Sequence, residues 1–233
     1  MSNAVRSVAC LALLAAFTLS AGEKDLKQLL DGVSGINASG LPGPVAPFGP
    51  DAFAVAVGSL GKARLPVVAG TRFGKGRALA FGKGEFFVPN ALNDADNARF
   101  VANCIAWVAP KAKPTVGVLG SAGFGAALQA KGIQAKDIAI GDVGSVDVII
   151  TKSTRMDAAQ VAQMQQAVKG GKGLLCGDLG WGWQQLNPGK SLSEDHPGNR
   201  IFSPMGIVWL GGMLKRTTGD GKAYDTTVKL PSF

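Results

Sequence analysis

The apolar residues in the second half of the chain are spaced as in alternating strands and helices. Short apolar runs predict buried strands at 115–119, 138–140, 146–150 and 174–176. Between them, residues 126–131 and 156–168 carry apolar side chains at helical spacing, and a glycine closes each segment. Strands that alternate with helices in this way predict a parallel sheet with right-handed crossovers.

The first half has a different pattern, in which apolar runs are joined by glycine turns. Residues 52–57 and 63–69 have strand character, and two apolar runs flank the Gly-Lys-Gly triplet at 74–76, which predicts a β-hairpin. Helical spacing predicts helices over 24–33 and 93–108. We therefore expect an α/β fold with a layered, mostly parallel sheet flanked by helices and a hairpin-containing N-terminal half.

Pro110 ends the second of these helices, and the Lys-Ala-Lys-Pro run at 111–114 has the composition of a connector. The expected organisation is an N-terminal α/β half over 23–112 and a C-terminal wound half over 113–233. The region 23–233 is long enough to be one large α/β domain or two small ones.

Residues 1–22 have the layout of a signal peptide. Arg6 supplies a positive charge, residues 8–17 are almost wholly apolar, and small residues precede the charged Glu23. The apolar stretch is shorter than the roughly 20 residues that span a bilayer. These features predict a secreted or periplasmic protein with no stable membrane span after cleavage. An uncleaved anchor or a buried N-terminal helix is the alternative.

The chain has a formal net charge of +8, but its basic residues are scattered. No block of like charges and no basic stripe interleaved with aromatic residues occurs, so nucleic acid is not an expected partner. A solvated basic surface explains the charge, and weak attraction to an acidic glycan or a membrane is the alternative.

Metal and cofactor chemistry have little support in the sequence. His196 is the one histidine of the chain, and the cysteines have no zinc-cluster spacing. Beyond the signal segment, Cys104 and Cys176 are either a disulfide or two buried thiols. Glycines at 120, 123 and 125 follow a strand, but in the reverse of the dinucleotide-binding spacing. We expect neither a metal nor a cofactor.

The loop expected after the strand at 174–176 is the best candidate for a ligand site, because wound α/β folds bind ligands there. It contains two tryptophans separated by one glycine, which would share a face on an extended chain and could stack on a sugar or a peptide. Core packing is the alternative. The candidate ligand-binding residues are Asp178, Trp181, Trp183, Gln184 and Asn187.

A second hypothesis pairs Cys176 with His196 as a nucleophile and its base. Asp178, Glu194 or Asp195 could orient the histidine. Against this hypothesis, Cys176 lies within an apolar run rather than at a turn between a strand and a helix. A buried structural cysteine explains the pattern better.

Several segments in series resemble the N-terminal region of the TRP-channel-associated-factor and enhancin-like metallopeptidase family. They are the glycine-rich run at 72–82, Asn-Cys-Ile-Ala-Trp-Val at 103–108, Val-Lys-Gly-Gly-Lys-Gly-Leu-Leu at 168–175, Gly-Trp-Gly-Trp at 180–183, and the stretch 199–206. The similarity covers about residues 25–210. It implies a fold like that of class I glutamine amidotransferases (flavodoxin-like), in a module that is usually non-catalytic.

The resemblance stops short of the peptidase activity, because one histidine cannot supply the His-Glu-x-x-His zinc motif of that family. The leading hypothesis is a secreted, non-catalytic module that binds an extracellular glycan or protein. The alternatives are a Cys-dependent hydrolase or amidotransferase-like enzyme that uses Cys176 and His196, and a structural accessory subunit of a separate peptidase.

Overall fold

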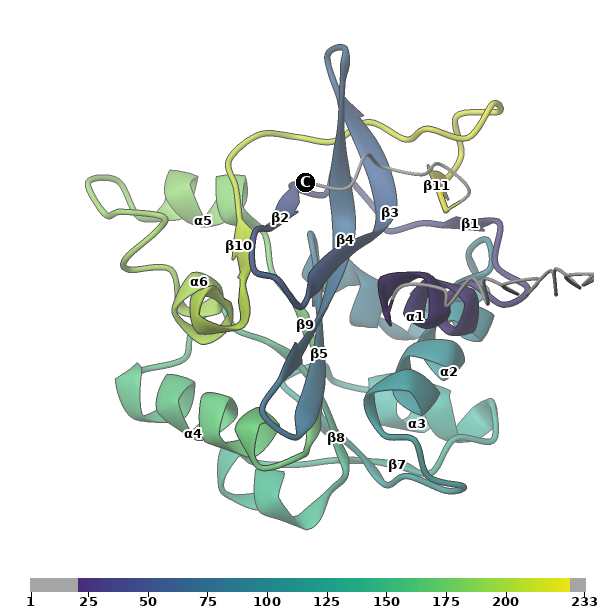
Figure 1. The fold of residues 1–233 in the computed structure, drawn as a ribbon, viewed down its shortest axis with the longest axis vertical. Coiled ribbons are helices and arrows are strands. Elements are labelled where there is room, and N and C mark those ends of the chain that lie inside the picture. Colours follow the sequence, from purple (N-terminus) through teal and green to yellow (C-terminus); the bar gives the residue numbers. More distant parts are fainter. Residues whose placement is uncertain (1–20, 227–233) are drawn as a thin grey trace, which may run out of the picture.

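Nine strands form one mixed sheet in the part of the chain that the computed structural model describes, residues 21–226 (Figure 1). In spatial order they are β1 (Gly35–Ile36), β11 (Tyr224–Asp225), β3 (Ala52–Leu60), β4 (Ala63–Phe73), β5 (Gly76–Phe81), β9 (Gly173–Gly177), β8 (Val148–Lys152), β6 (Val116–Leu119) and β7 (Ala135–Asp137). Neighbours are antiparallel from β1 to β5 and parallel from β5 to β7. Two further strands, β2 (Val45–Pro47) and β10 (Ile207–Trp209), pair antiparallel beside this sheet.

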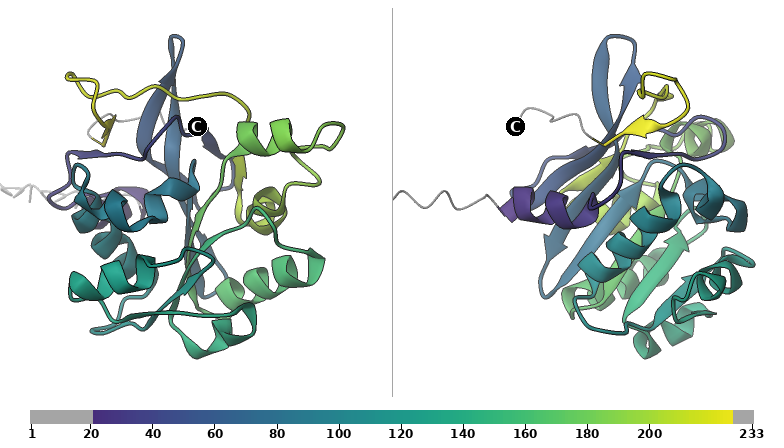
Figure 2. Two further views of the ribbon diagram at one scale, coloured as in Figure 1. Left: turned by 180° about the vertical axis from the view of Figure 1, so that it is seen from behind. Right: turned by 90° about the vertical axis from the view of Figure 1, so that its right-hand side faces the viewer.

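Helices cover both faces of the large sheet (Figures 1 and 2). One layer contains α1 (Ala21–Leu29), α2 (Asn97–Val108) and α3 (Phe124–Ala130), and the other contains α4 (Ala158–Lys169), α5 (Gly180–Leu186) and α6 (Pro197–Phe202). Short 3-10 helices are η1 (Gly84–Phe87), η2 (Pro89–Asn93), η3 (Ile140–Ser145) and η4 (Ser203–Met205). The expected layered α/β fold, with a hairpin in its N-terminal half, is confirmed.

Each face of the sheet has its own apolar core. Along β5, Leu79 and Phe81 pack into the cluster that contains the side chains of α2 and α3, whereas Ala78 and Ala80 pack into the cluster beneath α4 and α6. Because successive strand residues point to opposite faces, a strand that is covered on both faces needs an apolar residue at every position. This explains the continuous apolar runs of the sequence.

The expected hairpin turn joins β4 to β5. Gly74 has a φ of 59°, a left-handed conformation that glycine adopts without strain. A side chain at Gly76 would collide with the carbonyl oxygen of Val168, so the turn packs directly against the end of α4. Gly74 therefore allows the turn to form, and Gly76 allows the turn to pack against α4.

Both expected halves contribute to the large sheet, since β5 and β9 pair in parallel along 77–81 and 173–177. Two expected elements differ. The segment with two tryptophans is the helix α5 rather than a loop. The strand expected at 138–140 does not form there, because β7 ends at Asp137 and η3 begins at Ile140. The expected signal peptide lies outside the described residues except at its last two positions, where α1 begins.

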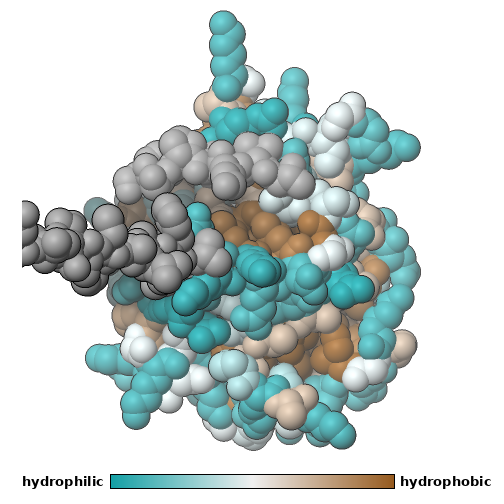
Figure 3. All heavy atoms as spheres, turned by 45° about the vertical axis from the view of Figure 1, so that its right-hand side comes forward, coloured by the Kyte–Doolittle hydropathy of each residue, from teal (hydrophilic) through white to brown (hydrophobic). Residues whose placement is uncertain are grey.

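Within residues 21–226, no helix has both the length and the apolar character of a membrane span. On the face seen in Figure 3, polar side chains surround several apolar areas.

Candidate functional site

Three neighbouring parallel strands, β5, β9 and β8, end together at one edge of the sheet. Phe81, Gly177 and Lys152 are aligned there. The chain then leaves β9 through Asp178 and enters α5 at Gly180. Open α/β sheets bind ligands at this edge, and a strand-to-helix turn is where α/β hydrolases place their nucleophile. In this chain that position holds a carboxylate.

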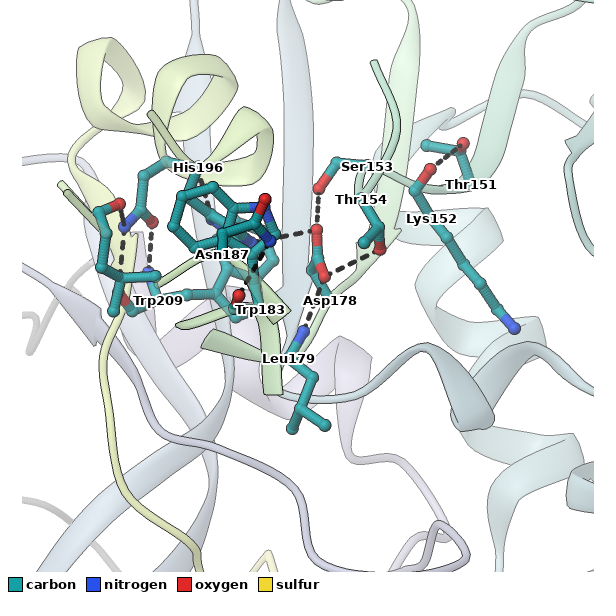
Figure 4. Close-up of polar contacts among 12 residues, drawn as sticks. Thr151, Lys152, Ser153, Thr154, Asp178, Leu179, Trp183, Asn187, His196 and Trp209 are labelled. Atoms are coloured by element: carbon teal, nitrogen blue, oxygen red, sulfur yellow. Dashed lines mark hydrogen bonds and ion pairs between the residues drawn. The ribbon is translucent and has the colours of Figure 1, made fainter. Parts of the chain in front are cut away.

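Asp178 is the centre of a buried polar network (Figure 4). Its Oδ1 accepts hydrogen bonds from the Thr154 hydroxyl at 3.0 Å and from the Leu179 N–H at 2.8 Å. Its Oδ2 accepts a hydrogen bond from the Ser153 hydroxyl and lies 3.2 Å from Nε2 of His196. The side chain is 3% exposed, so both oxygens are used inside the protein.

The surroundings of Asp178 favour its ionised form. Burial alone would raise the pKa of this carboxyl, but its contact with Nε2 of His196 opposes that effect. This contact, the Ser153 hydroxyl and the Leu179 N–H together lower the pKa of Asp178 below its ordinary value. A buried carboxylate held in this way stabilises its neighbours and is poorly placed to take a proton from a ligand.

His196 is fully buried and links the network to α6. Its Nδ1 accepts a hydrogen bond from the Asn199 N–H at 3.1 Å and caps the helix, which places the ring proton on Nε2, facing Asp178. The ring lies between two indoles, with centroid distances of 5.3 Å to Trp183 and 5.9 Å to Trp209. This histidine is therefore part of the core.

Asn199 extends the network to β10. Its Oδ1 accepts a hydrogen bond from the Trp209 N–H at 2.6 Å, and its Nδ2 donates to the carbonyl oxygens of Leu192 and Trp209 at 2.8 and 3.0 Å. The Trp209 indole N–H donates to the carbonyl oxygen of Phe81 at 2.9 Å. The ends of β5, β8, β9 and β10 are thus tied together by one set of polar contacts.

Cys176 does not form a pair with His196, because the two ring nitrogens of the histidine face Asp178 and the Asn199 N–H. The thiol is fully buried, and burial together with the charge of Asp178 raises its pKa far above the ordinary value. A thiolate is therefore strongly disfavoured. Cys104 is also buried, and both thiols are free, so of the two possibilities left open, the structure has separate thiols.

The two tryptophans of α5 have different surroundings. Trp183 is buried against His196, whereas Trp181 is partly exposed and donates from its indole N–H to the carbonyl oxygen of Leu41 at 3.2 Å. Residues two apart on a helix point to different sides, so the indoles do not share one face. Gln184 is exposed, and Asn187 donates to the carbonyl oxygen of Trp183 at 2.9 Å.

Four residues of the network were absent from the sequence-based set: Ser153, Thr154, Asn199 and Trp209. Ser153 and Thr154 directly follow β8, which the sequence predicted at 146–150, so the rule that pointed to Asp178 at a strand end also applies to them. No sequence signal identified Asn199 or Trp209. The indole of Trp209 has its partner at Phe81, on a distant segment, and the contact of Asn199 with Trp209 requires the chain to fold back from α6 to β10. Within residues 21–226, no three His, Cys, Asp or Glu side chains are grouped as a metal site would require.

Comparison with known proteins gives a clear relationship. The TCAF_N family, described as "TRPM8, N-terminal domain", matches residues 4–225. The TRPM8 channel-associated factor homolog of Danio rerio is 29% identical over 195 residues, which is 82% of this chain and 20% of that protein. TRPM8 channel-associated factor 2 of Homo sapiens is 26% identical, over 89% of this chain and 21% of that protein. The chain therefore spans about one fifth of the length of these relatives.

Among solved structures, the IMPa metallopeptidase from Pseudomonas aeruginosa has a similar fold. The TM-score is 0.59 at 17% identity, over 81% of this chain and 21% of that chain. The structure of the same peptidase in complex with an O-glycopeptide gives a TM-score of 0.59 at 19% identity, over 88% of this chain and 23% of that chain. The resemblance to the channel-associated factors and the enhancin-like peptidases is confirmed.

The comparisons correct one expectation, that of a secreted or periplasmic location. The matched family and the relatives are named for TRPM8 and for factors associated with that channel, and not as secreted or periplasmic proteins. The expectation rested on the apolar composition of the N-terminal stretch, and this composition does not distinguish a signal peptide from other apolar segments.

Proposed function

This chain belongs to the TCAF_N family, and we propose that it is a non-catalytic module that acts by binding another protein. The observation that carries the proposal is that the Asp178 network at the ends of β5, β9 and β8, which we call the strand-end site, is closed. Asp178 occupies the position of a nucleophile, but its two oxygens are used by Ser153, Thr154, Leu179 and His196. A catalytic base or nucleophile must reach its substrate, whereas this carboxylate is almost fully enclosed.

The kind of partner is suggested by the relatives. Several are named as factors associated with a channel, and the structural neighbours are peptidases in which the matching region is about one fifth of the chain. Both cases support a module whose partner is a polypeptide. An accessory role beside a separate peptidase is one form of this proposal.

A turnover assay tests the non-catalytic half of the proposal. Purified protein and its Cys176→Ala variant are incubated with glutamine, a glutamyl anilide and an activated ester, and ammonia or chromophore release is followed. We expect both proteins to stay at the buffer rate. Release that requires Cys176 and is lost in His196→Gln would replace the proposal with the Cys-dependent enzyme hypothesis.

A glycan partner is the second candidate. Structures of the peptidase neighbour are in complex with T-antigen and with an O-glycopeptide, and Trp181 keeps part of its indole exposed here. Calorimetric titration with an O-glycopeptide and with the same peptide lacking the sugar separates the two candidates. Binding that needs both the sugar and Trp181 supports the glycan, whereas equal binding of the two peptides supports a protein partner.

A further inference from the structure

Most of the large apolar side chains exposed within residues 21–226 are gathered at one end of the molecule. Four of the six belong to this group: Leu41 (37% exposed), Leu60 (41%), Leu210 (37%) and Met213 (40%). They lie where the tip of the β3–β4 hairpin meets the segments before β2 and after β10, at the top of Figure 1. We call this area, with the partly exposed Trp181, the hairpin-end surface.

Backbone contacts hold the segments of the hairpin-end surface together. The N–H of Leu210 donates to the carbonyl oxygen of Pro44 at 2.9 Å, and the N–H of Leu214 donates to that of Pro42 at 2.8 Å. The segments 41–44 and 210–214 therefore run side by side. The indole N–H of Trp181 donates to the carbonyl oxygen of Leu41. The apolar side chains are thus presented on a braced framework.

The hairpin is fastened to the same framework. Ser59 and Lys215 exchange backbone hydrogen bonds of 3.0 and 2.9 Å. The methyl groups of Leu60 lie so near Gly212 that a Cβ there would be 3.3 Å from the nearer one. Gly211 and Gly212 carry no side chains, so they leave the neighbouring Leu60, Leu210 and Met213 uncovered.

The charges around this surface have one sign. The segments 40–44, 59–64, 180–186 and 210–216 contain no Asp or Glu. Lys62, Arg64 and Lys215 are exposed there, and none of them forms an ion pair with a residue in the range 21–226. An apolar area bordered by unpaired cations is complementary to an apolar area bordered by carboxylates.

We propose that the hairpin-end surface docks a segment of another protein that combines leucine-like side chains with carboxylates. The proposal rests on the proposed function and names its surface and the chemistry of its partner. A protein segment fits better than a membrane. More than half of the surface of each exposed apolar side chain in this area is packed against the protein, so these side chains do not project far enough to insert into a lipid layer, whereas a partner of complementary shape can contact them.

Fluorescence anisotropy with three labelled peptides of equal length tests this proposal. One peptide combines Leu and Glu, the second combines Leu and Lys, and the third combines Ser and Glu. We expect the Leu-Glu peptide to bind most tightly and to weaken as salt is raised. Equal binding of the three peptides, or no binding of the Leu-Glu peptide, would overturn the proposal.

Matched variants locate the binding on the chain. We expect Leu210→Ser with Met213→Ser to weaken the Leu-Glu peptide by at least about tenfold. Phe48→Ser is the control, because Phe48 is 63% exposed but lies at the other end of β2, beside Gly206. Lys62→Glu with Lys215→Glu should shift the preference toward the Leu-Lys peptide. Thermal unfolding of each variant verifies that it is folded.

Two outcomes separate this proposal from its alternatives. Binding to phosphatidylserine vesicles without binding to the Leu-Glu peptide would replace the protein partner with a membrane. Unchanged affinity in the Leu210→Ser, Met213→Ser variant would reject the hairpin-end surface alone. By contrast, Cys176-dependent turnover would reject the proposed non-catalytic function and leave these affinities as they are.

Discussion

At the scale of single residues, the most consequential group is Asp178. It is a buried ion in contact with the one histidine of the chain, and three hydrogen-bond donors depend on its oxygens. Breaking a buried pair by removing one partner leaves the other groups unsatisfied, which costs far more than the pair itself contributes. The network is therefore a strong determinant of stability whatever the protein binds.

We predict that Asp178→Ala lowers the free energy of unfolding by about 3 kcal/mol. Urea denaturation measures the change, and Asp220→Ala is the control. Asp220 is exposed and its side chain is bonded to Thr218 and Lys222, so its loss should leave the free energy of unfolding nearly unchanged. If the two variants were equally stable, the Asp178 network would have no structural role.

A second carboxylate predicts a dependence of stability on pH. Lys111, 2.9 Å away, and the N–H and hydroxyl of Thr115 together hold the pKa of Asp147 at about 2. Because the folded pKa is below the unfolded one, the stabilisation is present above the unfolded pKa and is lost as the pH falls toward 2.

We expect Asp147→Asn to cost about 1 kcal/mol at neutral pH, a figure that allows for the partial exposure of the pair. The difference from the wild type should close between about pH 5 and pH 2. Urea titrations of both proteins across this range provide the measurement. A difference that grows as the pH falls would have the wrong sign for this account.

At the scale of elements, the packing of α6 on the end of β8 depends on one glycine. A Cβ at Gly198 would lie 2.8 Å from both Cε1 of His196 and Oγ of Ser153, closer than real Cβ contacts. We predict that Gly198→Ala costs about 2 kcal/mol, as overpacking does. Gly144→Ala is the control, because open space surrounds that position. Thermal unfolding compares the two, and a neutral Gly198→Ala would contradict the packing described.

The helix α5 shows where sequence patterns fall short at this scale. Its first four residues are Gly-Trp-Gly-Trp, and glycine disfavours helices by about 1 kcal/mol per residue. The helix forms because tertiary contacts, chiefly the burial of Trp183 against His196, override that preference. The elements with strong apolar patterns, β6, β8, α4 and β9, followed directly from the sequence, whereas β7 has the sequence Ala-Lys-Asp and was missed.

At the scale of the whole molecule, the layered α/β architecture was predictable, but the associations of distant segments were not. The pairing of β2 with β10, and that of segment 41–44 with 210–214, join residues more than 150 positions apart. No local pattern encodes such a pairing. The hairpin-end surface is built from such pairings. The contacts of Asp178 span at most 25 positions but still depend on how the strand ends and α6 meet in space. The sequence therefore identified Asp178 and Trp181 but not the surroundings that define their roles.

The central claim is that the strand-end site is closed in the native protein, and the labelling rate of Cys176 tests it most directly. In a Cys10→Ser background, a small thiol reagent is applied across a urea series, and the site of labelling is read by mass spectrometry. The account predicts that Cys176 and Cys104 are labelled only as fast as the protein unfolds. Rapid labelling of Cys176 in native protein, at a rate that depends on His196, would contradict it.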